Sequence, residues 1–347
     1  MSRIFVRGVG AVSPAGWGVE PLSQAVEGGR QLALKELDRP GRSKPLRVRT
    51  VPAPNPRPTF FGHARLRRSS PISQFAVAAS LEALGGDLAK VNDGSLRLGI
   101  VCCVMSGCVN YSRRFYDEVL REPSTASPLV FPETVFNAPS SHLAALLGAD
   151  AINYTLVGDP GTFVQGLALG AQWLCEELVD GCLVVGAEEM DWLTADAFRL
   201  FTRRLVLSEG AGALYLRGDV GEGRGAELVA ISDSHLFWDR AGRVKAAGTV
   251  AKQLRSASSD WLCDGLQDVP LLDEPDAVAW ADWRGTRLSP KRIVGEGLMA
   301  ASGWQCVLAS AAVRRGDARE ALVSVVGCNQ QAIGARFSRS VNGNELV

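Results

Sequence analysis

The residues Asp159, Pro160 and Gly161 form a short turn between a predicted strand and a long apolar helix. The surrounding sequence, NYTLVGDPGTFVQGLALGAQWL, runs from Asn153 to Leu174. Many α/β enzymes present a nucleophile at such a turn, because a helix N-terminus stabilises a thiolate. Pro160 has no thiol, no hydroxyl group and no backbone N–H. The turn is suited instead to starting a helix, with Asp159 as the N-cap and Pro160 as the first helical residue.

Other residues that could act as a nucleophile or a base are few. The chain has three histidines, His63, His142 and His235, and we expect each to have a structural or surface role. Ser106 and Cys108 follow a buried strand, but no histidine lies near them in the sequence to activate them. The end of a buried strand therefore explains these two residues better than a relocated nucleophile does.

The composition is that of a globular protein without a charge bias. The 347 residues are 46% hydrophobic, and 37 Lys and Arg balance 37 Asp and Glu. We therefore expect no nucleic-acid binding through bulk electrostatics. No apolar run approaches the roughly 18 residues of a membrane span, and the first residues lack the layout of a signal peptide. The eight cysteines have no metal-ligand spacing, so we expect reduced thiols in a cytoplasmic protein, with no metal and no cofactor.

Hydrophobic periodicity predicts an alternation of strands and helices. Helical spacing appears in GVEPLSQAVEGG, SPISQFAVAASLEALGG, SSHLAALLG and GTFVQGLALGAQWLCEELVDG. Strand-like runs appear in RIFVRGVGAVSP, LRLGIVCCVMSG, AINYTLVG, CLVVGAEE, GAGALYLRG, AELVAISDSHLF, EALVSVVGC and AIGARFSRS. This order is typical of an α/β protein with helices on the faces of a layered sheet.

A glycine-rich segment, GEGRG from Gly221, is a plausible hinge between two α/β halves, residues 1–218 and 224–347. It is not a phosphate loop, because it lacks the Gly-Lys-Ser/Thr ending. Residues 38–69 contain six Pro and nine Arg or Lys. This composition excludes a regular helix and predicts a long basic surface loop.

The order of five segments resembles the β-ketoacyl synthases of the thiolase superfamily. They are VRGVGAVSPAGWGVEPLSQAVEGG, SPISQFAVAASLEAL, PLVFPETVFNAPSSHLAALLGADAINYTLVGD, LSEGAGALYL and KRIVGEGLMAASG. The likeness covers nearly the whole chain and implies a thiolase-like fold of two similar halves in an αβαβα sandwich. The chain is shorter than the family pattern before LSEGAG, where FRLFTRRLV replaces a longer segment.

The resemblance implies that three catalytic positions are altered. The family pattern Ala-Cys-x-Ser-Gly-x-x-Ala falls on residues 159–166, which places Pro160 at the nucleophile. Glu296 stands in place of one catalytic histidine, and Asp264 is the best equivalent of the other. Loss of the nucleophile's own N–H would also remove an oxyanion-hole donor, which costs roughly 10²–10³ in rate. A carboxylate at Glu296 would be a poor proton donor to an enolate at neutral pH. As an exposed charge near a helix start, Glu296 should contribute only about 0.3–1 kcal/mol to stability.

Within the family, these losses resemble the chain-length factors, which lack the catalytic cysteine and pair with an active ketosynthase. The resemblance implies a biosynthetic role in making fatty acids, polyketides or aryl polyenes, with an acyl carrier protein as a further partner. It also implies an acyl tunnel, for which Thr162, Phe163, Glu296 and Cys328 are candidate lining residues; Phe163 either plugs the tunnel or packs in the core. Residues 151–157 correspond to the strand that pairs across the family's two-fold axis, with Asn153 and Thr155 near that axis.

Two alternatives stay open beside the chain-length-factor reading. One is a homodimeric protein without activity that binds acyl chains or a carrier protein. The other is an enzyme with altered chemistry, a thioesterase, decarboxylase or acyltransferase that uses Glu296 or Asp264. The basic loop is either a docking site for an acidic carrier protein or an ordinary solvated surface.

Overall fold

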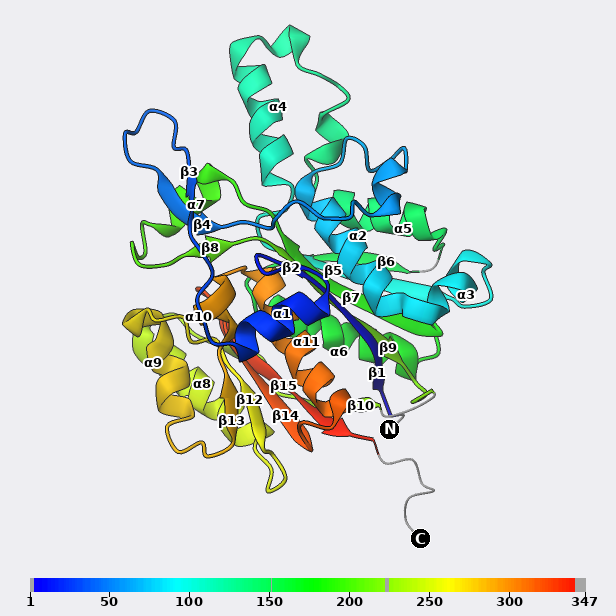
Figure 1. The fold of residues 1–347 in the computed structure, drawn as a ribbon, viewed down its shortest axis with the longest axis vertical. Helices are drawn as coiled ribbons and strands as arrows, with labels where there is room; N and C mark the ends of the chain where they lie inside the picture. The colour runs from blue at the N-terminus through cyan, green and yellow to red at the C-terminus, as the bar shows by residue number, and fades with distance from the viewer. Residues whose placement is uncertain (1–2, 151, 222–224, 341–347) are drawn as a thin grey trace.

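A computed structural model describes residues 3–150, 152–221 and 225–340 of the chain (Figure 1). The helices are α1 (Val19–Glu27), α2 (Pro71–Leu84), α3 (Leu88–Asn92), α4 (Val109–Arg121), α5 (Ala138–Leu147), α6 (Thr162–Cys175), α7 (Trp192–Phe198), α8 (Arg240–Leu254), α9 (Pro270–Ala279), α10 (Pro290–Val294) and α11 (Met299–Arg315). The strands are β1 (Phe5–Ser13), β2 (Gly16–Trp17), β3 (Lys35–Leu37), β4 (Leu46–Arg49), β5 (Leu98–Val104), β6 (Asn153–Val157), β7 (Gly181–Glu188), β8 (Leu207–Ser208), β9 (Gly210–Arg217), β10 (Ala226–Ile231), β11 (His235–Leu236), β12 (Trp261–Cys263), β13 (Thr286–Leu288), β14 (Glu320–Val326) and β15 (Gln331–Arg339). Each strand and helix expected from periodicity is formed.

The main sheet has the strand order β13-β12-β14-β15-β10-β1-β9-β7-β5-β6. Its two ends have the same pairing pattern. In one, β6, β5 and β7 are parallel and β9 and β1 follow as antiparallel strands; in the other, β13, β12 and β14 are parallel and β15 and β10 follow as antiparallel strands. The two sets meet at a short β1–β10 pairing through Phe5 and Val6.

The hydrophobic residues divide into three main cores, which separate five layers. Along β5, Val101 and Cys103 face a central core that also contains residues of α6, α11, β12, β14 and β15. The alternate residues Ile100 and Cys102 face an outer core with α2 and α5. A third core packs α8 on the outer face of β12 and β14. The α/β class and the thiolase-like layering expected from the sequence are therefore confirmed.

Helix α11 occupies the central layer because small residues allow it to approach the sheet. All its residues from Met299 to Val313 are buried. A Cβ atom added to Gly303 would lie 2.9 Å from the Cα of Gly212 in β9. The indole N–H of Trp304 donates to the carbonyl oxygens of Val12 and Ala211, each at 3.0 Å. These contacts fix the start of α11, and with it the residues that precede the helix.

The division of the chain at residues 218 and 224 remains a proposal. The repeated strand order supports two similar units, one ending with β9 and the other beginning with β10. The predicted hinge, GEGRG, lies mostly outside the described residues, as does the boundary at residue 224.

The basic segment 38–69 is not wholly a loop, which corrects the expectation from its composition. Residues 46–49 form β4, which pairs with β3 and β8 in a second, small sheet. Leu46 and Val48 are buried and pack against Leu207 and Leu298. The stretch LRVR alternates apolar and basic residues, and this alternation is the sequence feature that could have predicted the strand.

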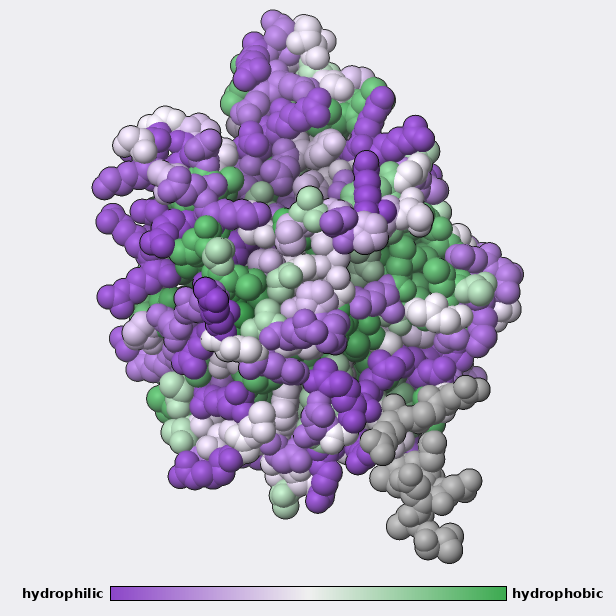
Figure 2. Space-filling view, viewed as in Figure 1, coloured by the Kyte–Doolittle hydropathy of each residue, from purple (hydrophilic) through white to green (hydrophobic). Residues whose placement is uncertain are grey.

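Helix α4 and the chain that follows it project from the body as an arm, seen at the top of Figure 1. Hydrophilic residues cover most of the face seen in Figure 2, with hydrophobic residues in smaller patches between them. The arm nevertheless carries several exposed apolar side chains: Tyr116, Leu120, Leu129, Phe131, Val135 and Phe136. Exposed apolar residues gathered on one projecting element are typical of an interaction surface.

Candidate functional site

The turn at Asp159–Gly161 is held tightly to the second half of the chain. The carboxylate of Asp159 is buried and accepts hydrogen bonds from the N–H of Gly161 at 3.0 Å and from the side-chain amide of Gln331 at 3.1 Å. The backbone N–H of Gln331 donates to the other carboxylate oxygen at 3.2 Å. A Cβ atom on Gly327 would lie 1.8 Å from this carboxylate, so glycine is required there. Burial raises the pKa of Asp159, although these hydrogen bonds oppose the rise.

The helix begins two residues later than the sequence predicts. Helix α6 starts at Thr162, and Gly161 is its N-cap residue. Asp159 still satisfies the turn, because its carbonyl oxygen accepts from the N–H of Thr162 at 2.8 Å and its side chain accepts from Gly161. Pro160 is buried in this turn, and its carbonyl oxygen accepts from Phe163. The polar groups of the turn therefore form the hydrogen bonds that start the helix.

Glu296 lies just before α11 and forms a buried ion pair. Its Oε2 atom is 2.8 Å from Nζ of Lys291, and both side chains are almost wholly buried. The other carboxylate oxygen accepts from the N–H of Leu298 at 2.8 Å. Burial alone would lower the pKa of Lys291, but the negative charge of Glu296 raises it above its ordinary value. The expectation of an exposed, weakly held Glu296 is wrong, because the chain folds its carboxylate inward onto Lys291.

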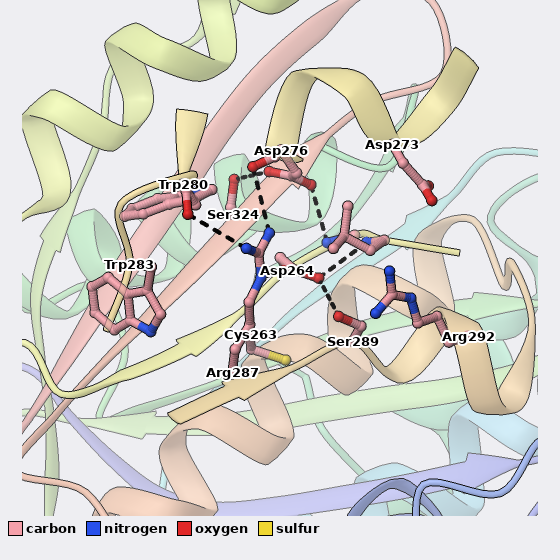
Figure 3. A network of polar contacts seen from close by, with 12 residues as sticks. Cys263, Asp264, Asp273, Asp276, Trp280, Trp283, Arg287, Ser289, Arg292 and Ser324 are labelled. Atoms are coloured by element: carbon pink, nitrogen blue, oxygen red, sulfur yellow. Dashed lines mark hydrogen bonds and ion pairs between the residues drawn. The ribbon is translucent and has the colours of Figure 1, made fainter. Parts of the chain in front are cut away.

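Asp264, at the end of β12, lies in a separate polar network (Figure 3). One carboxylate oxygen pairs with Arg287, while the other accepts from the hydroxyl of Ser289 at 2.7 Å and from the N–H of Leu266 at 3.0 Å. Asp264 is fully buried, and every bond named here holds the loop after β12 in place. This arrangement leaves Asp264 with a structural role.

Asp276 of α9 completes the same network. Its carboxylate accepts from the hydroxyl of Ser324 at 2.7 Å and from the N–H of Gly265 at 3.1 Å. Burial and the neighbouring charge of Asp264 raise the pKa of Asp276 to about 6.

A cavity of about 430 Å³ lies beside Glu296. Its lining residues are Met105, Ala197, Phe198, Phe201, Thr202, Leu205, Phe237, Trp238, Asp239, Arg240, Arg243, Gln267, Leu271, Leu272, Pro275, Glu296, Val326, Cys328 and Asn329. The structure thus brings together two of the predicted pocket residues, Glu296 and Cys328. Thr162 and Phe163 are buried and do not line this cavity; Phe163 packs in the central core.

Arg243 of α8 also lines this cavity and was not expected from the sequence. Its Nη2 atom donates to the carbonyl oxygen of Gly327 at 3.1 Å, whereas its buried Nε has no hydrogen-bond partner among the described residues. Burial lowers the pKa of Arg243. In the sequence, DRAGRVKAAG has the appearance of an exposed basic helix, so no local signal distinguishes Arg243 from its neighbours.

Three further buried carboxylates, also missed, hold loops at the ends of β7 and β9. Glu188 accepts from the N–H of Ser106 at 3.1 Å, Glu189 from that of Asn110 at 2.8 Å, and Glu209 from that of Met190 at 2.9 Å. Burial raises the pKa of Glu188 to about 8 and that of Glu209 to about 7.

The histidines and most of the cysteines lie elsewhere. His142 contacts Glu133 at 2.8 Å, His235 contacts Gln253 at 2.9 Å, and His63 is exposed. Cys108 is buried, and burial raises the pKa of its thiol, as it does for Cys328. Within the described ranges, no group of three His, Cys, Asp or Glu side chains could hold a metal ion.

Strand β6 is at the end of the main sheet, and its pairing is with β5. Thr155 shares a hydrogen bond of 2.9 Å with Ser140, and the side chain of Asn153 donates to the carbonyl of Ser140 at 3.2 Å. Tyr154 and Val157 each expose about half of their surface. The predicted strand began at residue 151, which lies outside the described residues.

No helix in the described part of the chain has both the length and the apolar character needed to cross a membrane. The sequence matches no family model and no curated protein. Solved structures do share its fold.

A β-ketoacyl synthase from Burkholderia phymatum STM815 superposes with a TM-score of 0.80 at 16% identity, covering 98% of this chain and all of that one. The ketosynthase ApeO in complex with its chain length factor ApeC, from Xenorhabdus doucetiae, gives 0.78 at 14% identity over 98% of both chains. A type II polyketide ketosynthase, AntDE, in complex with its acyl-carrier protein, AntF, gives 0.75 at 16% identity, covering 97% of this chain and 99% of that one. The chain therefore has the thiolase-like fold of the ketosynthases and chain length factors.

Proposed function

We propose that this chain is a ketosynthase-like subunit without condensing activity of its own, and that it works as a chain-length-factor-like partner of an active ketosynthase. The observation that carries the proposal is the state of the turn at Pro160. The position predicted for the nucleophile has no thiol and no N–H, and the preceding Asp159 turns its carboxylate into the fold toward Gln331. The fold is that of the ketosynthases, yet this turn has the hydrogen bonds of a helix start.

The two other altered positions agree with this proposal. Glu296 is held by Lys291 and Leu298, and the oxygens of Asp264 are held by Arg287, Ser289 and Leu266. A general base needs a free lone pair directed at its substrate. This gives little support to a thioesterase, decarboxylase or acyltransferase that uses Asp264, and Glu296 would first have to leave Lys291.

The partner surface in this proposal is strand β6 together with the α4 arm. An open, apolar sheet edge is an aggregation hazard unless it is covered. Tyr154 and Val157 on β6 are half exposed, and the arm adds Phe131 and Phe136. A ketosynthase partner would cover this edge, and a second copy of the chain is the alternative when no such partner is present.

An acyl carrier protein would dock beside the cavity mouth, on the segment that follows α7. Arg199, Arg203 and Arg204 line a hollow of about 390 Å³ that shares Phe198 and Leu205 with the cavity beside Glu296. In the described part of the chain these three arginines form no ion pair, and Arg203 and Arg204 are exposed. Unpaired positive charge at the mouth suits an acidic carrier, so this segment is a better docking site than the loop 38–69 suggested by composition.

Co-expression tests the proposal. The chain is purified alone and together with a ketosynthase from its host that retains the Cys-His-His triad, and both preparations are assayed for condensation with malonyl- and acyl-carrier protein. We expect a stable heterodimer, no condensation by the chain alone, and products whose length depends on its presence. Condensation by the chain alone would refute the proposal. So would a ketosynthase that does not bind this chain and gives products of the same length with and without it.

A further inference from the structure

We propose that the cavity beside Glu296 binds a free carboxylic acid with an unbranched apolar chain of medium length, and that the carboxylate sits on the guanidinium group of Arg243. This inference concerns a free acid and does not depend on a ketosynthase partner. Among the charged residues that line the cavity, Arg243 is the cation that has no carboxylate partner in the described part of the chain.

The other charged groups of this cavity already have partners. Glu296 pairs with Lys291 at 2.8 Å, and Arg240 pairs with Glu274 at 2.5 Å. Asp239 caps α8 by accepting from the N–H of Gly242 at 2.6 Å. The carboxylate of Glu296 is thus neutralised by Lys291 and does not oppose an incoming anion as a free charge would.

Arg243 differs from these groups. It forms no ion pair with any described carboxylate, and its contacts are one carbonyl oxygen, that of Gly327, and the ring of Phe237 at 5.8 Å. Its Nε has no hydrogen-bond partner among the described residues either, but the protein encloses that atom, so a ligand in the cavity would meet the terminal nitrogens of the guanidinium group. A carboxylate is the acceptor that best matches a guanidinium, because it can take two parallel hydrogen bonds.

The side chains that line the cavity indicate the chemical character of the rest of the ligand. Most lining side chains are aromatic or aliphatic, including Phe198, Leu205, Leu272 and Val326. At the mouth, Trp238 is 88% exposed and Phe201 is 74% exposed. A cavity of about 430 Å³ is within the range of small-molecule sites, which bury apolar ligands and orient them with a few polar groups.

The gradient of burial gives the ligand a direction. Glu296 is only 3% exposed, whereas Trp238 and Phe201 are largely exposed to solvent. The carboxylate would therefore lie inside, and the chain would run outward between Phe198 and the exposed aromatic side chains. An apolar chain in this position would cover surface that is otherwise in contact with water.

Calorimetric titration at neutral pH tests the proposal with three ligands that separate charge from chain. Decanoate has both the carboxylate and the chain, decan-1-ol has the chain alone, and malonate has carboxylates without a chain. Decanoate is kept below the concentration at which it forms micelles. We expect decanoate to bind about tenfold or more tightly than decan-1-ol, and malonate to bind weakly or not at all.

Variants locate the site. Arg243→Gln should weaken decanoate binding about tenfold or more, and Arg243→Lys should weaken it less, because a point charge is retained without the bidentate geometry. Lys245→Gln is the matched control, since it removes one positive charge from an exposed position of the same helix that does not line the cavity. Phe201→Ser should weaken both decanoate and decan-1-ol, because it removes part of the wall and leaves the charge.

The outcomes are decisive in either direction. Equal affinities for decanoate and decan-1-ol, or the same decanoate affinity in Arg243→Gln and Lys245→Gln, would overturn the assignment of Arg243. Malonate binding as tightly as decanoate would overturn the apolar chain. The ligand comparison uses the unaltered protein, so it stands even if an Arg243 variant does not fold.

Discussion

The ammonium group of Lys291 and the carboxylate of Glu296 lie 2.8 Å apart, and 3–4% of each side chain is exposed. They are five residues apart, on either side of the end of α10, where Gly295 takes a positive φ of 92°. The positive φ turns the chain so that Glu296 points back at Lys291. At the position that the sequence resemblance assigns to a catalytic histidine, this chain therefore has a buried ion pair.

This pair predicts a large effect for Glu296→Gln. Removing one charge leaves Lys291 buried without its partner, and such losses cost about 3–5 kcal/mol. We expect the free energy of unfolding, measured in urea, to fall by about 3 kcal/mol. This replaces the small effect expected for an exposed glutamate.

The double variant Lys291→Met with Glu296→Gln is the control. It removes both charges, so it should recover part of the lost stability. A single variant as stable as the parent chain would contradict the buried pair.

A second prediction concerns acylation. Because Pro160 has no thiol, and because burial raises the thiol pKa of Cys108 and Cys328, we expect no stoichiometric adduct with an acyl-carrier thioester or with cerulenin. Intact mass spectrometry decides this, with an active ketosynthase treated in parallel. Pro160→Cys alone should not give condensation, because the two positions that the resemblance assigns to catalytic histidines hold Glu296 and Asp264.

An adduct that maps to one cysteine would contradict this prediction and would favour altered chemistry. Iodoacetamide provides the control for ordinary reactivity, because Cys175 is exposed. Iodoacetamide should label the protein at Cys175, while the buried thiols remain unmodified.

The buried carboxylates predict how stability depends on pH. The folded-state pKa is about 8 for Glu188 and about 7 for Glu209, both above the ordinary value of 4.5. The folded chain therefore holds these protons more tightly than the unfolded chain does. Their stabilising contribution is fully present below pH 4.5 and is lost as the pH rises toward 8.

Urea unfolding between pH 5 and pH 8 measures this trend. We expect the free energy of unfolding to fall as the pH rises. Glu188→Gln cannot titrate, so it should be less stable at pH 5, because it loses one acceptor, and should show a flatter dependence. A slope unchanged by Glu188→Gln would assign the trend to other groups.

The fold could be predicted from the sequence because it depends on patterns spread over the chain. Short continuous apolar runs predicted β5 and β7, and helical spacing of apolar residues predicted α6. Candidate site positions could also be numbered, since Pro160 and Glu296 lie in segments with a recognisable order. Their contacts could not be predicted, because the partners of Asp159 come from residues 327 and 331, far away in the sequence.

Arg243 and the buried glutamates were missed for a related physical reason. A charged residue in a polar helix segment has no local feature that shows burial, so only the packing of α8 against the loop at Gly327 identifies Arg243. Glu188 and Glu209 are at strand ends, where a charge is expected to be solvated. The small sheet of β3, β4 and β8 was missed because prolines and arginines hide a four-residue strand.

If the carrier protein docks on the segment after α7, reversing the charge of its arginines should weaken carrier binding. The double variant Arg203→Glu with Arg204→Glu should weaken carrier-protein binding strongly, because both side chains are exposed beside the cavity mouth. Arg284→Glu with Arg319→Glu makes the same change of charge at the opposite end of β14 from Cys328, and should have little effect. Surface plasmon resonance at two salt concentrations measures both, and equal losses in the two variants would indicate a non-specific charge effect.

The last prediction concerns assembly through β6. Val157 is 53% exposed on the open edge of the main sheet, so Val157→Asp would place a charge in the proposed interface. We expect the purified parent chain to be a dimer, with an interface on the order of 2,000 Å² or more and Asn153 and Thr155 near the axis. Val157→Asp should yield monomer or aggregate, because a buried unpaired charge opposes the interface.

Val278→Asp is the matched control for this experiment, since Val278 is 56% exposed on α9, in the other half of the chain. It should leave the dimer intact. Light scattering after size exclusion measures the mass of all three proteins at one concentration. A parent chain that is monomeric, or a dimer that tolerates Val157→Asp as well as Val278→Asp, would show that β6 is not the interface. The partner surface would then have to lie elsewhere, and the likeness to paired ketosynthases would extend to the fold alone.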